Sequence, residues 1–266
     1  MGRRNPLTLF FYLAGRQTVR IVGNLGAILI FFITAFIKIF QRRQAVEIIQ
    51  QIFYIGAKSS GIVTLVALFT GMVLGLQLFY TLIKFGSEGV LGTAIALSLV
   101  RELGPVLTAI MITARAGSAM AAEIGILRIS EQIDALYTMR IDPTRFIVSP
   151  KIAASIISFP LLTAFFDLVG ILGGYLTGVV LLGVNGGTYV YRVQSSLNIS
   201  DVRGGFIKAL VFGAIVSTIC CYQGYFCHMR DGQHGAKAVS AATTSAVVLS
   251  CVMVLVADYV VTSFIM

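Results

Sequence analysis

Two adjacent charged residues, Arg101 and Glu102, lie inside the otherwise apolar stretch SLVRELGPVLTAIM, residues 98–111. A charge inside a membrane is costly unless it is paired or faces a polar cavity, so such residues commonly carry a function. Pro105 has no N–H to donate to the Arg101 carbonyl, which predicts a kink and a free acceptor at the same place. We therefore expect either a buried ion-pair network or the polar floor of a substrate cavity.

The two charged side chains need separate partners. Consecutive residues point about 100 degrees apart around a helix, so Arg101 and Glu102 cannot share one face. Asp167 and Asp258 lie in later apolar segments, and either is a candidate partner for Arg101. Glu102 or Asp258 could instead relay protons, which is the chemistry of an ion-coupled secondary transporter.

The composition of the chain indicates that lipid is its solvent. Of the 266 residues, 57% are hydrophobic and 12% are charged, and the mean hydropathy is +0.91. Ordinary soluble domains carry about twice that charged fraction. The net charge of +9 arises from Lys and Arg residues between apolar runs, with no basic stripe interleaved with aromatic residues. We therefore expect a membrane protein with no nucleic-acid partner.

Five apolar runs are long enough to cross a bilayer, which requires roughly 20 residues each. The predicted spans are residues 57–83, 89–114, 147–182, 205–227 and 238–263. A further apolar stretch, residues 21–40, is bracketed by Lys and Arg residues, so we expect interfacial helices over residues 1–50, with a sixth span as the alternative. The sequence thus predicts an all-α integral membrane protein with a transmembrane domain over residues 51–266.

The positive charges favour one orientation of the chain. With the N-terminus in the cytoplasm, the inside-facing segments carry most of the 20 Lys and Arg residues. Cytoplasmic loops are enriched in these residues, so we expect the N-terminus in the cytoplasm and the C-terminus on the opposite side.

The sequence offers no convincing site for a nucleotide, a metal or another cofactor. The stretch GAKSSG, residues 56–61, lacks the Gly that precedes Lys in a phosphate-binding loop. Cys227, His228 and His234 match no zinc spacing. The cysteines lie in or beside apolar segments and are expected to be buried thiols: Cys220, Cys221, Cys227 and Cys251. We expect this chain not to be an enzyme.

Glycines repeat at a spacing of four residues in the first and third predicted spans. They are Gly71 and Gly75 in the first span, and Gly170, Gly174 and Gly178 in the third. This spacing lines small residues along one helix face and lets another backbone approach closely. The pattern predicts tight helix packing and specifies no function.

The segment AAEIGILRISEQIDALYTMRIDP, residues 121–143, is too polar to cross the membrane. Its apolar residues recur at steps of three and four, which predicts a short amphipathic cytoplasmic helix over residues 121–139. Asp142 and Pro143 form the expected cap and first-turn pair that opens the third span. The polar face is acidic, whereas a helix bound to lipid headgroups is rich in Lys and Arg. A protein partner is therefore the better interpretation.

Residues 98–151, from SLVRELGP to RFIVSPK, closely resemble the signature region of the MlaE/YrbE family. Members of that family are the permease subunits of ABC-type lipid transporters that work with MCE proteins. Weaker likeness extends through GMVLGLQ at residues 71–77 and from ATT at residues 242–244 to the closing ADYVVTSFIM. One departure is Ser245, where family members often carry Arg, so a basic contact at that position is in doubt.

The resemblance implies a particular assembly and activity. The permease would form a homodimer in the bacterial inner membrane, bind a cytosolic ABC ATPase on each protomer, and meet a hexameric MCE ring in the periplasm. A small cytosolic accessory subunit is also possible. The complex would move phospholipid between the inner and outer membranes and so affect outer-membrane lipid asymmetry. ATP would be hydrolysed by the partner ATPase. The sequence fixes neither the lipid species nor the direction of transport.

The resemblance also implies roles for individual residues. The 121–139 helix would receive the motion of the ATPase through its docking residues Glu123, Arg128, Glu131, Asp134 and Leu136. A lipid cavity between the protomers would be lined by Leu74, Gln77, Leu78, Thr81, Leu82 and Phe85. Arg101 and Glu102 would lie at the base of that cavity.

Two other classes of function compete with this interpretation. An ion-coupled secondary transporter would use Glu102 or Asp258, but no internal repeat is detectable and such a carrier has no evident use for an acidic docking helix. A scaffold that only anchors other proteins would leave Arg101 and Glu102 with structural roles alone. Dependence of transport on ATP, and lipid bound to the purified complex, separate the three.

Overall fold

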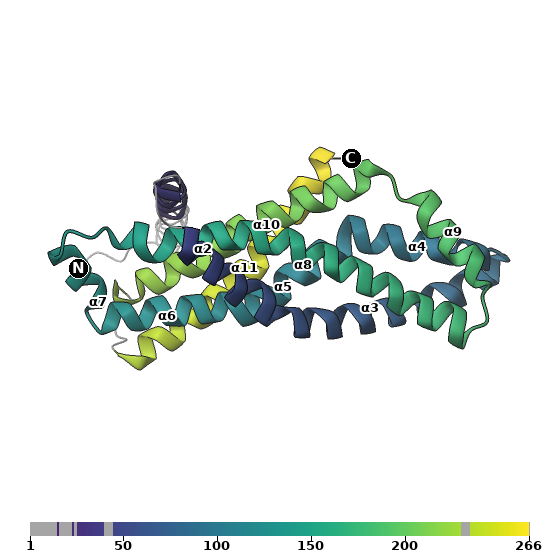
Figure 1. Ribbon diagram of the computed structural model, residues 1–266, viewed down its shortest axis with the longest axis horizontal. Coiled ribbons are helices and arrows are strands. Elements are labelled where there is room, and N and C mark those ends of the chain that lie inside the picture. Colours follow the sequence, from purple (N-terminus) through teal and green to yellow (C-terminus); the bar gives the residue numbers. More distant parts are fainter. Residues whose placement is uncertain (1–14, 16–22, 24–25, 40–44, 230–234, 266) are drawn as a thin grey trace, which may run out of the picture.

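The computed structural model describes residues 15, 23, 26–39, 45–229 and 235–265. The described chain is almost entirely helical and contains no strand. Five long apolar helices lie side by side along one axis (Figure 1). They are Ala45–Phe85, Glu88–Ile129, Thr144–Leu181, Ile199–Tyr225 and Ala236–Ile265. These helices overlap the five predicted spans, and the prediction of an all-α integral membrane protein is confirmed.

Several of the long helices consist of shorter elements joined without a break, in which α labels an α-helix and η a short π-helical or 3-10 turn. The first contains α2 (Ala45–Ile52), η1 (Phe53–Ala57), α3 (Lys58–Leu82) and η2 (Ile83–Phe85). The second contains η3 (Glu88–Val90), α4 (Leu91–Ser98), η4 (Leu99–Leu103), α5 (Gly104–Ile112), η5 (Thr113–Gly117) and α6 (Ser118–Ile129). The third contains η6 (Thr144–Val148), α8 (Ser149–Tyr175) and η7 (Leu176–Leu181). The fourth and fifth are α10 (Ile199–Tyr225) and α11 (Ala236–Ile265).

Short elements connect the long helices at the two ends of the bundle. They are α7 (Gln132–Thr138) at one end, α9 (Gly186–Ser196) at the other, and η8 (Cys227–Met229) before α11. The α7 end and the α9 end lie at opposite extremes of the long axis (Figure 1). Asp142 caps the third helix as predicted, because its Oδ1 accepts hydrogen bonds from the Thr144 N–H at 3.0 Å and the Arg145 N–H at 3.4 Å.

The predicted helix over residues 121–139 is divided in the structure. Its first half belongs to α6, which continues the second long helix to Ile129, and its second half is α7. Glu131 has a φ of 58°, in the left-handed region that breaks a right-handed helix. Periodicity alone did not reveal this break, because Ile133 is buried and Leu136 partly buried on the same inner side as Ile124.

A shorter apolar helix, Gly26–Ile39, lies across the bundle axis and not along it (Figure 1). Phe31 and Ala35 are buried against the bundle, and the Ala35 carbonyl accepts a hydrogen bond from the Ser149 hydroxyl at 2.8 Å. Ile30 and Ile37 on other faces are exposed. The interfacial placement of residues 1–50 and the alternative of a sixth span stay predictions. Most of the remaining predicted interfacial region, residues 1–25 and 40–44, lies outside the described residues.

The glycine pattern gives the tight helix packing that the sequence predicts, and in the structure it lies between α3 and α8. A Cβ added at Gly71 would overlap the backbone oxygen of Gly170, and one at Gly75 would lie 3.4 Å from the Gly174 oxygen. Gly178 instead makes room for the Leu91 side chain of α4. The absence of side chains at these positions lets the two backbones touch, which maximises dispersion contacts where lipid provides no hydrophobic driving force between helices.

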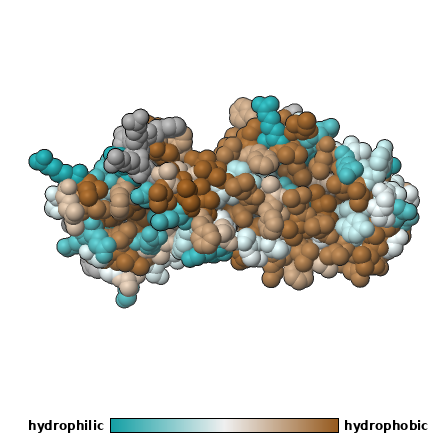
Figure 2. Space-filling view, viewed as in Figure 1, coloured by the Kyte–Doolittle hydropathy of each residue, from teal (hydrophilic) through white to brown (hydrophobic). Residues whose placement is uncertain are grey.

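The surface has the polarity of a membrane-embedded bundle. Hydrophobic residues cover most of the middle and of the half toward α9, while hydrophilic residues gather at the α7 end and at the tip beyond α9 (Figure 2). Large exposed apolar side chains on α3 include Leu65, Phe69 and Val73. Such a contiguous apolar surface would be a liability in water and is what hydrocarbon requires.

Candidate functional site

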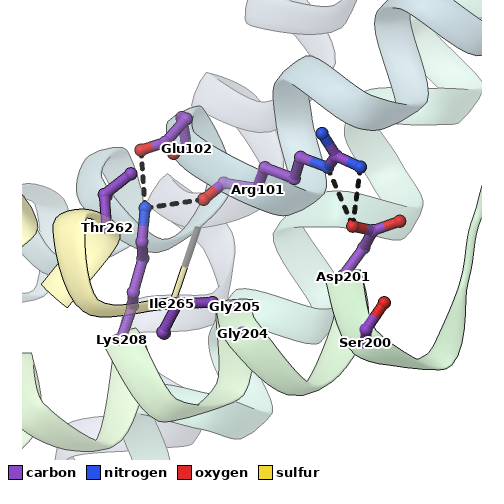
Figure 3. A pocket seen from close by; sticks show the side chains of 9 residues that line it. All are labelled: Arg101, Glu102, Ser200, Asp201, Gly204, Gly205, Lys208, Thr262 and Ile265. Atoms are coloured by element: carbon purple, nitrogen blue, oxygen red, sulfur yellow. Dashed lines mark hydrogen bonds and ion pairs between the residues drawn. The ribbon is translucent and has the colours of Figure 1, made fainter.

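A single buried lysine organises the polar site within the bundle. Lys208 of α10 has only 4% of its side chain exposed. Its Nζ donates to Glu102 Oε2 at 2.6 Å and to the Arg101 carbonyl oxygen at 2.9 Å (Figure 3). Asp258 Oδ1 of α11 lies 3.1 Å from the same nitrogen, close enough for an ion pair although the angles do not make a hydrogen bond. We call Arg101, Glu102, Asp201, Lys208 and Asp258 the Lys208 cluster.

Arg101 finds its partner on the same helix as Lys208. Its Nε and Nη2 lie 2.9 and 2.8 Å from Asp201 Oδ1 (Figure 3). The second oxygen of Asp201 accepts the Asn198 N–H at 3.2 Å and completes the capping box of α10. Forty per cent of the Arg101 side chain is exposed. Because a guanidinium carries five N–H donors, this one retains donors for a further anion.

The local sequence brings η4 and α10 close enough for these pairs. Residues 99–103 form a π-helical turn directly before Pro105, which shifts Arg101 and Glu102 relative to an unbroken α-helix. A Cβ at Gly205 would lie 2.7 Å from the Val100 oxygen, so only glycine permits this approach. Asp201 and Lys208 are two turns apart on α10 and therefore face the same side. Arg101 and Glu102, which an ideal α-helix would place on different faces, thus both meet opposite charges on α10.

All members of the Lys208 cluster except Asp258 line a cavity of about 210 Å³. The lining residues are Arg101, Glu102, Ser200, Asp201, Gly204, Gly205, Lys208, Thr262 and Ile265 (Figure 3). At roughly 30 Å³ per water molecule the space suits a polar group and not a long acyl chain. Cationic and anionic side chains both reach it, so the site can contact a phosphate through Arg101 and an amine through the carboxylates.

The structure resolves the question of partners that the sequence left open. Neither Asp167 nor Asp258 pairs with Arg101. Asp258 binds Lys208, and Asp167 lies against Gly104, with its Oδ1 buried and without a hydrogen-bond partner among the described residues. Lys208 and Asp201 were not singled out from the sequence. The signal for Lys208 was present, because it lies inside the apolar run GGFIKALVFGAIV, as Arg101 and Glu102 lie inside theirs.

The candidate lipid-lining residues of α3 lie on a different surface from the Lys208 cavity. Gln77, Thr81 and Phe85 form an exposed stripe at four-residue spacing, and the Thr81 hydroxyl donates to the Gln77 carbonyl at 2.9 Å. The partly buried residues pack into the apolar core near α9: Leu74, Leu78 and Leu82. None of these six residues lines the Lys208 cavity within this chain.

The candidate docking residues differ in their exposure and in their contacts within the chain. Glu131 is exposed at the break between α6 and α7. Asp134 is exposed on α7 and pairs with Arg128 at 2.7 Å, while Arg128 also lies 3.1 Å from His228 Nδ1. Leu136 is partly buried in the core near α7. Glu123 is also exposed, and it binds the buried Lys151 at 2.8 Å.

Two groups at the α7 end have shifted pKa values. Burial pushes the pKa of Asp142 upward, but the Lys38 ammonium and the Arg145 and Thr144 N–H groups outweigh burial and hold this pKa below 3.8. Partial burial and the Arg128 guanidinium lower the pKa of His228 below 6.5. Both shifts favour the forms that hold the connections around α7 together.

The described residues contain no group of three His, Cys, Asp or Glu side chains placed to hold a metal ion. The four cysteines, all within the described ranges, are free thiols. Cys227 donates to the Gly125 carbonyl at 3.7 Å and His228 contacts Arg128. His234, the third residue of the possible metal site, lies outside the described residues.

Five long apolar helices around a buried charge cluster define an integral membrane protein of the polytopic, helical class. The family described as Permease MlaE matches residues 48–264. The match covers more than half of the chain, and the chain therefore belongs to the MlaE permease family. The resemblance inferred from residues 98–151 is confirmed.

Curated relatives agree with this assignment. The chain is 41% identical over 249 residues to a probable ABC transporter permease protein of Rickettsia bellii, covering 93% of this chain and 94% of the relative. It is 42% identical over 217 residues to the intermembrane phospholipid transport system permease protein MlaE of Haemophilus influenzae, covering 81% of each chain. It is 36% identical over 216 residues to the chloroplastic protein trigalactosyldiacylglycerol 1 of Arabidopsis thaliana, covering 81% of this chain and 60% of the relative.

Proposed function

We propose that this chain is the permease subunit of an ABC transporter that moves phospholipid between the inner and outer membranes of a bacterium. The observation that carries the proposal is the 42% identity, over 81% of both chains, to a Haemophilus permease named for phospholipid transport. Names of the Rickettsia relatives support the ABC class of transporter. The chain is the membrane subunit, and a separate ATPase hydrolyses ATP.

The Lys208 cluster is suited to the headgroup of a phospholipid. The exposed donors of Arg101 can bind a phosphate, and planar guanidinium groups suit that geometry. Glu102 offers a carboxylate to a headgroup amine within the same cavity. The cavity is too small for acyl chains, so these chains would extend along apolar helix surfaces outside it.

A second copy of the chain would supply the remaining walls of the lipid site. The exposed stripe of Gln77, Thr81 and Phe85 lies outside the Lys208 cavity in one protomer. Among the five long helices, α11 is the least buried within the chain, so its surface is available to lipid or to another protomer. A homodimer cavity that joins the α3 stripe to the Lys208 cluster would hold both ends of one lipid.

ATP-driven motion would enter at the α7 end. Glu131 and Asp134 present negative charge there. From Leu91 to Ile129 the chain is one continuous helix that carries Arg101 and Glu102 in its π-helical turn. Such turns are places where helices bend. A displacement of α6 would therefore alter the cavity around Lys208 and drive lipid out of it.

The orientation follows from the same assignment. The α7 end would face the cytoplasm and the ATPase, and a small cytosolic accessory subunit could join there. The α9 end would face the periplasm and an MCE-domain ring. This placement agrees with the concentration of Lys and Arg residues in the segments expected inside.

The proposal is tested by purifying the tagged protein from its native membrane in mild detergent, with mass spectrometry of the proteins and lipids that accompany it. Recovery of an ABC ATPase, an MCE-domain protein and phospholipid is expected. The complex is then placed in vesicles of phosphatidylethanolamine and phosphatidylglycerol that contain a fluorescent phosphatidylethanolamine. Lipid movement that requires ATP supports the proposal, whereas movement driven by a pH gradient without ATP would establish the ion-coupled carrier.

A further inference from the structure

A second buried lysine, Lys151, joins three helices at the α7 end of the bundle. It lies in the first turn of α8, and only 3% of its side chain is exposed. Its Nζ donates to Glu123 Oε2 of α6 at 2.8 Å and to Gln51 Oε1 of α2 at 3.4 Å. One ammonium thus holds together helices that are distant in sequence.

A second cationic side chain reaches the same part of the first long helix. Arg115 of η5 donates from Nη1 to the Tyr54 carbonyl at 2.8 Å and to the Ser59 hydroxyl at 3.2 Å. Its guanidinium carbon lies 5.3 Å from the centroid of the Tyr54 ring. Tyr54 belongs to η1, the π-helical turn that separates α2 from α3. Both cations therefore contact the bend formed by residues 51–59.

The two partners of the Lys151–Glu123 pair depend on it unequally, because the lysine is buried and the glutamate is exposed. A buried ammonium that loses its carboxylate is strongly destabilised, because its charge stays in a poorly solvated place without an opposite charge. Glu123 is 48% exposed and can be hydrated when the pair opens. The lysine therefore requires the glutamate more than the glutamate requires the lysine. If α6 moves, the bend follows it or the pair breaks.

The position of Glu123 on α6 connects the bend to the candidate docking surface. Glu123 lies within the same helix that ends at Ile129, directly before the break at Glu131 and α7. On the other side, the bend continues into α3, which carries the exposed stripe of Gln77 and Thr81. The contacts thus form a route from α7 to α3 that does not pass through the Lys208 cluster.

We propose that Lys151 is a positioning residue that transmits displacement of α6 and α7 to the bend at η1 and so to α3. Glu123 accordingly acts within the chain as the partner of Lys151, and not as a contact for the ATPase. The proposal rests on the proposed function for the source of the displacement, an ATPase bound at α7. Arg115 keeps the bend attached to the second long helix during the movement.

The test uses the purified complex of the full chain with its ATPase, with and without a non-hydrolysable ATP analogue. Hydrogen exchange measured by mass spectrometry reports amide protection at α6–α7 and at residues 45–62. In the wild type we expect the analogue to change both regions. In Lys151→Met the analogue should still change amide protection at α6–α7. Its effect on protection at residues 45–62 should fall by about fivefold, which is the smallest factor typical of coupling between two sites.

Two further variants separate coupling from folding. Glu123→Lys combined with Lys151→Glu restores an ion pair of opposite direction and should recover the response at residues 45–62. Lys58→Met is the matched control, because Lys58 is exposed at the same bend and lies 4.8 Å from the Tyr54 ring centroid. It should respond as the wild type does. If Lys151→Met does not assemble, recovery of assembly and response in the charge-reversed pair supports the proposal, and failure to recover overturns it.

Lipid transfer separates this proposal from the proposed function. Fluorescent phosphatidylethanolamine moved per ATP hydrolysed should fall in Lys151→Met by about fivefold, while ATP hydrolysis itself persists. An unchanged exchange response at residues 45–62 in Lys151→Met overturns the role of Lys151 even when the wild type transports lipid. A wild-type complex that moves no lipid contradicts the proposed function, and the exchange experiment still decides the role of Lys151.

Discussion

Lys208 donates a hydrogen bond at 2.9 Å to the backbone oxygen of Arg101, the acceptor that Pro105 leaves without its α-helical donor. The same ammonium binds the side chain of Glu102, the next residue. One lysine therefore supplies the missing donor to a backbone carbonyl and neutralises the carboxylate of the next residue. Pro105 and the Lys208–Glu102 pair thus belong to one arrangement. The free carbonyl gives the buried ammonium a further acceptor, and the ammonium satisfies that carbonyl inside the membrane.

Replacing Lys208 with Met should destabilise the folded protein. The change leaves Glu102 and Asp258 facing one another without a cation and the Arg101 carbonyl without its donor. Breaking a buried pair costs roughly 3 kcal/mol or more, which for a chain of this size lowers the melting temperature by about 6–12 °C. Thermal unfolding in detergent measures the effect. Lys84→Met, at an exposed position, is the control, and equal melting temperatures for the two variants would contradict the prediction.

Arg101→Ala should reduce lipid transfer more than it reduces the amount of folded protein. The Arg101 side chain is partly exposed and lines the cavity, so its removal deletes a donor for the headgroup while Lys208 remains in place. Losing one charge-assisted contact of about 1.5–3 kcal/mol corresponds to roughly tenfold or more in affinity. Transfer in vesicles is compared with detergent-solubilised yield. Proportional losses in the two quantities would indicate a purely structural role.

Much of the fold follows from the sequence because lipid restricts the choices. Each long apolar run must be a helix, since unpaired backbone groups are not tolerated in hydrocarbon. The glycine spacing likewise predicts close helix packing, and the structure shows which helices make it, because Gly71 of α3 meets Gly170 of α8. The free carbonyl of Arg101 can also be predicted from the sequence, because Pro105 lacks the N–H that would bind it.

The partners of the charges could not be predicted in the same way. Arg101 pairs with Asp201, and Glu102 with Lys208, because α10 approaches η4 through Gly205, which periodicity does not reveal. Lys208 lies near the start of the predicted fourth span, residues 205–227. Its position inside the apolar run was visible, but its burial depends on how the helices pack.

Gly71→Ala should destabilise the packing of α3 on α8, while Gly61→Ala on the same helix should not. A Cβ at Gly71 overlaps the Gly170 backbone, which cannot move aside as a side chain would. Overpacking of this kind costs about 1–3 kcal/mol or more. Gly61 has open space around its Cβ position, so alanine there should stabilise α3 by about 0.5–1 kcal/mol. Melting temperatures in detergent compare the two, and equal shifts would refute close backbone contact.

Glu131→Lys should weaken attachment of the ATPase without altering the fold. The left-handed backbone with a φ of 58° at this position disfavours glutamate and lysine to a similar degree, so the substitution changes charge and little else. We expect the ATPase recovered with the purified protein to fall by roughly tenfold, about 1.4 kcal/mol of binding free energy. Glu88→Lys at the α9 end is the matched control. Full recovery of the ATPase with Glu131→Lys would remove this residue from the docking surface.

Acidification should loosen the contact between α6 and η8 that Arg128 makes with His228. The Arg128 guanidinium donates toward the His228 ring, and a protonated ring can no longer accept. Partial burial and Arg128 lower the pKa of His228 below 6.5, so the unfolded chain binds a proton more readily than the folded chain. The stabilising contribution is therefore complete above about pH 6.5 and is lost as the pH falls below it. Melting temperatures measured from about pH 7.5 to about pH 5.5 should fall more steeply for the wild type than for His228→Gln, which does not titrate in this range. Parallel curves for the two proteins would show that His228 makes no such contribution.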